Sequence, residues 1–111
     1  MPKLKTLLQK HRADFGQWFV QLAVVFVLAA TSVPGVNESH YLTKARHFFD
    51  SSFAPGDLFL NSGNSHYAST LLAGSFSLFM PLRAVAWVGR FLAWGFLSFA
   101  WIRFGQSLRI P

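Results

Sequence analysis

The sequence has no cysteine and few charged residues. None of its 111 residues is Cys, and Asp, Glu, Lys and Arg together make up 13% of them. The lack of thiols excludes disulfides, cysteine-ligated zinc and cysteine catalysis, and it leaves no sign of the redox compartment. Soluble domains carry about 25% charged residues, so this chain has too little charge for an ordinary water-exposed surface.

Acidic residues are scarcer still, with 4 Asp and Glu against 10 Lys and Arg and a formal net charge of +6. The basic residues nearest the termini lie before the first apolar run or around the end of the last one: Lys3, Lys5, Lys10, Arg12, Arg103 and Arg109. This distribution follows the positive-inside rule, and it differs from the basic face that a soluble nucleic-acid-binding domain presents. We therefore expect a lipid bilayer as partner, no nucleic acid, and a multi-pass protein of the cell membrane with both termini cytoplasmic.

Hydrophobic residues make up 52% of the chain, and the 13 Phe and 4 Trp gather in long runs. A membrane-spanning helix needs about 20 apolar residues. The runs at 17–36 and 82–105 meet this length, with Trp18 placed as an interfacial anchor of the first. A secretory signal peptide is the alternative interpretation of the first run.

The predicted fold is an all-α membrane protein with two transmembrane helices and two interfacial helices in the intervening external loop. Its predicted parts are a basic cytoplasmic N-terminus at 1–16, transmembrane helix 1 at 17–36, an external loop at 37–81 with interfacial helices at about 37–50 and 66–80, transmembrane helix 2 at 82–105, and a cytoplasmic tail at 106–111.

Residue spacing predicts how these helices present their side chains. In 37–50, with Asn37 as the expected N-cap, one apolar stripe contains Tyr41, Leu42, Ala45, Phe48 and Phe49. Small-residue stripes, which allow close helix packing, occur at Ser69, Ala73 and Ser77 and at Ala86, Gly89, Ala93 and Ala100. Other transmembrane helices are therefore possible partners.

Arg90 lies inside the second apolar run. A charge in hydrocarbon costs at least about 2.5–3.5 kcal/mol on insertion scales. We expect Arg90 either to reach the outer interface or to face a polar partner.

The external loop holds most of the titratable side chains. His40 and His47 lie seven positions apart on one predicted helix, about 10 Å along its axis, which is too far to share a metal ion. We expect no metal and no cofactor. Glu38 begins the same helix and has two interpretations: a general base for a hydroxyl nucleophile, or an anion stabilised by the helix dipole.

The order of these elements resembles the N-terminal part of GT-C-type polytopic membrane glycosyltransferases. Their first external loop commonly opens with Asp-Glu, then an aromatic residue and Ala-Arg. Here the loop reads Asn37-Glu38-Ser39-His40-Tyr41 and continues Lys44-Ala45-Arg46, and the second span carries Arg90. The resemblance covers about residues 15–105.

The resemblance implies glycosyl transfer from a polyprenyl-phosphate-linked sugar in full-length relatives. It implies Glu38 as the candidate catalytic base, and a phosphate-binding set of Lys44, Arg46, His66 and Arg90. The acid that usually acts as base is replaced here by Asn37, whose amide cannot accept a proton from an acceptor hydroxyl.

We therefore expect a fragment or truncated member of this family, inactive alone, because two spans cannot enclose a donor cavity. The alternative is a small two-span structural or accessory membrane protein that packs on a partner.

Overall fold

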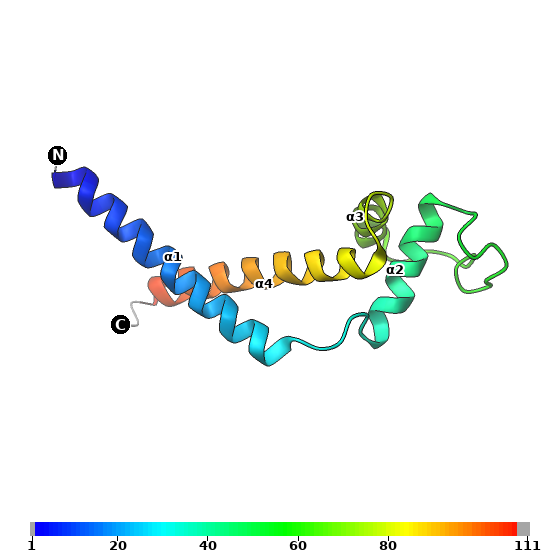
Figure 1. Ribbon diagram of the computed structural model, residues 1–111, viewed down its shortest axis with the longest axis horizontal. Helices are drawn as coiled ribbons and strands as arrows, with labels where there is room; N and C mark the ends of the chain where they lie inside the picture. The colour runs from blue at the N-terminus through cyan, green and yellow to red at the C-terminus, as the bar shows by residue number, and fades with distance from the viewer. Residues whose placement is uncertain (1, 109–111) are drawn as a thin grey trace. The chain divides into compact units, whose positions relative to one another are not determined.

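The computed structural model describes residues 2–108, and in this part of the chain all regular secondary structure is helical (Figure 1). Four helices follow one another: α1 (Pro2–Ala29), α2 (Val36–Phe49), α3 (Tyr67–Ser77) and α4 (Leu82–Ser107). They belong to two compact units. The first contains the chain up to Ala30 and from Phe91 onward, and the second is Thr31–Arg90.

Two of the helices are long enough and apolar enough to cross a membrane. These segments are Leu8–Ala29 of α1 and Leu82–Ser107, the whole of α4. The segment expected as a separate N-terminus at 1–16 is helical from Pro2 and continuous with the apolar part of α1. The C-terminal tail predicted at 106–111 lies largely outside the described residues, and Arg109 with it.

The first apolar helix ends earlier than the sequence indicated. We expected it to span 17–36, but α1 ends at Ala29, and the Ala30 amide donates to the Phe26 carbonyl at its end. The residue before a proline is disfavoured in the α region, and Thr31 and Ser32 offer the backbone competing hydrogen bonds. The chain therefore leaves the helix before Pro34 and begins α2 at Val36.

In the first unit, aromatic side chains of α1 pack on α4. The Trp18 indole N–H donates to the Gly95 carbonyl at 3.0 Å, and Phe26 stacks on Phe91 with ring centroids 5.9 Å apart. A Cβ at Gly95 would lie 3.4 Å from the Trp18 ring, which is an ordinary van der Waals contact. Ser98, one turn further along α4, is completely buried.

The contact between α1 and α4 thus does not use the small-residue stripe predicted for α4. Ala93 and Ala100 of that stripe are exposed, and a Cβ added at Gly89 would meet nothing within 4 Å. The remaining member of the stripe, Ala86, is buried, but it belongs to the second unit. The sequence does contain a stripe of small residues, but α1 packs on a different face of α4.

In the second unit, α2 packs against α3. The closest approach is at Gly74, where a Cβ would lie 2.5 Å from the Phe49 ring and 2.6 Å from the Ala45 carbonyl oxygen. Ala45 is 1% exposed. The contact face of α3 contains Thr70, Gly74 and Ser77, so the predicted stripe was right at Ser77 and wrong by one residue at Ser69 and Ala73.

The helix ends also differ from prediction. The N-cap of α2 is Gly35 rather than Asn37, and α3 begins after His66 and ends at Ser77 rather than spanning 66–80. Gly35 takes the cap position because the Glu38 carboxylate accepts its amide N–H at 2.6 Å, which is the backward half of a capping box. Asn37 then lies inside the first turn.

Candidate functional site

The acid that opens the loop and the arginine of the second apolar helix form one ion pair. Arg90 Nε donates to Glu38 Oε1 at 2.7 Å, and Arg90 Nη2 donates to Glu38 Oε2 at 2.7 Å. The side chains of Arg90 and Glu38 are 12% and 31% exposed. Two parallel N–H···O bonds between a guanidinium and a carboxylate are the strongest common form of this contact.

The remaining donors of Arg90 bind the segment that leaves α1. Nη1 donates to the Thr31 carbonyl at 2.7 Å and Nη2 to the Ser32 carbonyl at 3.3 Å. The guanidinium also lies over the Trp87 ring, 5.4 Å from its centroid. Of the two placements considered for Arg90, the structure shows the one with a polar partner.

The electrostatics of Glu38 follow from these contacts. The hydrogen bond from Arg90 lowers the pKa of the Glu38 carboxyl below its ordinary value, the Gly35 N–H lowers it further, and partial burial opposes both. A carboxylate with a lowered pKa and both oxygens occupied is a weaker proton acceptor than a free one. In this arrangement Glu38 joins the start of α2 to Arg90.

Lys44 is bound by the loop that follows α2. Its ammonium donates to Ser62 Oγ at 2.7 Å, to the Gly63 carbonyl at 3.0 Å and to the Phe59 carbonyl at 3.2 Å. It also lies 4.6 Å from the centre of the Phe59 ring. Since an ammonium has three donors, the protein's own oxygens account for all of them.

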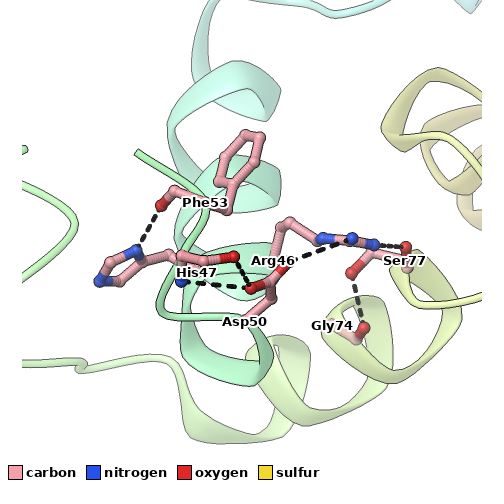
Figure 2. A network of polar contacts seen from close by, with 7 residues as sticks. Arg46, His47, Asp50, Phe53, Gly74 and Ser77 are labelled. Carbon is pink, nitrogen blue, oxygen red and sulfur yellow. Dashed lines mark hydrogen bonds and ion pairs between the residues drawn. The ribbon is translucent and has the colours of Figure 1, made fainter. Parts of the chain in front are cut away.

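Arg46 and His47 connect α2 to two other segments (Figure 2). Arg46 pairs with Asp50 at 3.3 Å and donates to the Ser77 carbonyl at the end of α3. His47 is nearly buried, with Nδ1 2.7 Å from the Phe53 carbonyl oxygen and Nε2 3.2 Å from Asn61 Oδ1.

The carboxylate of Asp50 is held by the turn that follows α2. The Ser52 hydroxyl is the main cause of a lowered pKa at Asp50, with smaller contributions from the Ser52 amide and Arg46. The ion pair of Asp50 with Arg46 spans one helical turn, and the two side chains are 32% and 28% exposed.

A pocket of about 780 Å³ lies between α2, the loop and the start of α3. Two of the four predicted phosphate-binding residues, Lys44 and His66, line it, together with Asn37, His40 and Tyr41. Its aromatic wall is ordered by edge-to-face contacts, because Tyr41 meets the His66 ring at 5.1 Å and Phe59 meets the His40 ring at 5.5 Å.

The structure therefore divides the predicted site. It brings Lys44 and His66 into one pocket and Glu38 and Arg90 into one ion pair, while Arg46 lines a separate hollow of about 410 Å³ beside the end of α3. Among residues 2–108, no three His, Asp or Glu side chains gather closely enough to hold a metal ion.

Sequence reasoning missed the residues that hold the loop in place. Asn64 accepts the His66 amide and the Thr70 hydroxyl through Oδ1, while its buried Nδ2 has no hydrogen-bond partner. An Asn two residues before the N-cap of a helix is a recognisable turn signal, and it was available in the run NSGNS. The role of Gly74 had no local signal, because it depends on the position of α2.

Comparisons with protein families, curated proteins and solved structures find no match for this chain.

Proposed function

We propose that the chain is an integral membrane protein that crosses the bilayer twice, through α1 and α4, with both termini in the cytoplasm. The intervening segment then lies on the non-cytoplasmic side of the cell membrane, with α2 and α3 near the lipid surface. The length and apolar character of the two helices support this placement. So does the basic sequence before the first apolar run, since cytoplasmic segments carry the excess of Lys and Arg.

Within this arrangement, Thr31–Arg90 acts as a loop module of the GT-C glycosyltransferase type. The observation that carries this proposal is the ion pair between Glu38 and Arg90. These two residues are 52 positions apart, and they are the acid and the arginine on which the resemblance depends. Their contact joins the acid of the first loop motif to the arginine of the second apolar helix.

The module is inactive by itself under this proposal. Asn37 cannot serve as a base, and Glu38 serves as one only after its release from Arg90 and from the Gly35 amide. In full-length relatives the corresponding loop would serve glycosyl transfer from a polyprenyl-phosphate-linked sugar. The pocket lined by His66 and Lys44 is the proposed phosphate-binding surface here, because Arg46 and Arg90 bind carboxylates of the chain itself. Lys44 contributes its positive charge to this pocket, while its three N–H groups donate to the loop.

The experiment compares binding of a polyprenyl phosphate and of the polyprenol of equal length to the full chain in detergent micelles, by native mass spectrometry. We expect the phosphate to bind at least about tenfold more tightly, a difference of about 1.4 kcal/mol. His66→Ala should reduce this preference, whereas His11→Ala, at an exposed site in α1, should leave it unchanged. Equal binding of the two lipids would contradict the proposal.

A second candidate is a structural or accessory protein that packs on another transmembrane helix. It is favoured by the open Gly89 and the exposed Ala93 and Ala100 of α4, which let a second helix approach closely. Equal binding of polyprenol and polyprenyl phosphate would favour this candidate.

A further inference from the structure

The outward face of α3 is apolar and lies opposite its contact with α2. Thr70, Gly74 and Ser77 are buried. The other side of the helix and the turn after it expose large apolar side chains: Leu71, Leu72, Phe76, Leu78 and Phe79. Leu72 is 64% exposed and Phe79 is 85% exposed. Between His66 and Arg83 the chain carries no charged residue.

The three serine hydroxyls of α3 each donate to a backbone carbonyl of the preceding turn. Ser69 donates to the His66 carbonyl, Ser75 to the Leu72 carbonyl and Ser77 to the Gly74 carbonyl, at 3.0, 2.8 and 2.6 Å. Such bonds to the preceding turn give a hydroxyl a partner without water. In a medium that offers no hydrogen bonds, every polar group needs a partner of this kind.

The position of α3 in the chain is close to a helix that is long enough and apolar enough to cross a membrane. Only Leu78–Pro81 separate it from α4, which is long and apolar enough to cross a membrane. The exposed apolar side chains of α3 are thus continuous in sequence with a proposed lipid-facing surface.

The other helix of the loop, α2, has a different surface. Only part of the apolar stripe of α2 is covered by α3. Ala45 is 1% exposed and the Phe49 ring lies against the Gly74 position, whereas Tyr41 and Phe48 are 50% and 49% exposed. Other parts of α2 carry Lys44 and His40 into the polar pocket. The exposed apolar side chains of α2 thus share a short helix with Glu38, Lys44 and Arg46, whereas α3 carries no charged residue.

We propose that α3 is the more deeply lipid-inserted helix of the loop, with its Leu72 and Phe76 face in the acyl region, and that α2 lies closer to the water. This inference rests on the proposed membrane placement of α1 and α4. It narrows that proposal, in which both loop helices lie near the lipid surface.

The test uses the lack of native cysteine, which makes each introduced Cys a unique labelling site. Single spin labels are placed at Leu72→Cys and Phe76→Cys on α3, at His40→Cys on α2 and at Leu97→Cys in α4. The full chain is reconstituted into vesicles of phosphatidylcholine and phosphatidylglycerol. Collision of each label with oxygen, which concentrates in lipid, is compared with collision with a water-soluble nickel chelate.

We expect the oxygen-to-nickel ratio at positions 72 and 76 to exceed that at position 40 severalfold and to approach that at 97. High nickel collision at 72 and 76 with a lipid-like ratio at 97 would overturn this inference and leave the membrane proposal standing. Low collision with both reagents at 72 and 76 would show a protein partner on this face and would also overturn it. High nickel collision at 97 would overturn both proposals.

Discussion

At the scale of single residues, the cationic side chains of the second unit act mainly on the protein itself. Arg90 binds Glu38 and two carbonyl groups, Lys44 binds three oxygens of the loop, and Arg46 binds Asp50 and the end of α3. Basic residues that resemble a phosphate-binding set in the sequence therefore hold a long irregular loop in one conformation. This is a physical reason for their presence that requires no substrate.

The Glu38–Arg90 pair predicts a specific dependence of stability on pH. Because the pKa of Glu38 is lowered in the folded state, its contribution to stability is present above the unfolded pKa and is lost as the pH falls through the folded pKa. Glu38→Gln keeps the shape but loses the charge, so we expect the free energy of unfolding at pH 7 to fall by about 1 kcal/mol. The difference from wild type should shrink below about pH 4.3, the ordinary pKa of a glutamate.

Unfolding by SDS titration in detergent micelles, followed by circular dichroism, measures this difference at each pH. Asp50→Asn is the matched control, because its ion pair with Arg46 is a single contact at 3.3 Å between residues four apart, and pairs of this kind contribute about 0.3–0.5 kcal/mol. A constant difference between wild type and Glu38→Gln from pH 7 to pH 3 would contradict the role of the charge.

At the scale of elements, the second unit depends on the close approach of α2 and α3. Neither helix has side chains for a large core, and the largest completely buried side chains in the described residues are those of Ser77 and Ser98. Gly74 allows the backbone of α2 to lie directly on α3, which compensates for the shortage of bulky buried groups.

Gly74→Ala tests this contact. The added Cβ would lie 2.6 Å from the Ala45 carbonyl oxygen, and rotation of the Phe49 side chain cannot relieve a clash with the backbone. We expect a loss of about 1–3 kcal/mol in the free energy of unfolding, measured by the same SDS titration. Gly89→Ala is the control, since its Cβ meets nothing within 4 Å and alanine favours a helix by up to about 1 kcal/mol. Equal effects of the two substitutions would show that the α2–α3 contact is looser than described.

At the scale of the whole molecule, the membrane proposal assigns each segment to one side of the bilayer. Cysteine introduced at Ser62 should react with an impermeant maleimide added to intact cells, whereas cysteine at Gln106 should react only after the membrane is opened. Both positions are exposed in the structure, so burial would not prevent either reaction. Cysteine at Ser77, which is 2% exposed, is a control that should react only after denaturation. A protected Ser62 position with an accessible Gln106 position would reverse the proposed orientation.

The sequence by itself determined the parts of this protein that depend on local interactions. Length and apolar content located α4 closely and α1 only in part, since α1 spans Pro2–Ala29 rather than 17–36. Residue spacing located α2 and, approximately, α3. Helix existence is predictable because a helix satisfies its backbone hydrogen bonds within a few residues. The ends were less predictable: Gly35 rather than Asn37 caps α2 because the Glu38 side chain is available to its amide.

Only the tertiary structure decided which charged side chains pair and which helix faces pack together. Glu38 and Arg90 are 52 positions apart, so no local pattern indicated that the two side chains would form an ion pair. The contact faces of α3 and α4 differed from the predicted small-residue stripes, because the face that packs depends on where the partner helix lies. The physical reason is the same in both cases: pairing and packing are properties of two segments together, and spacing within one segment does not contain them.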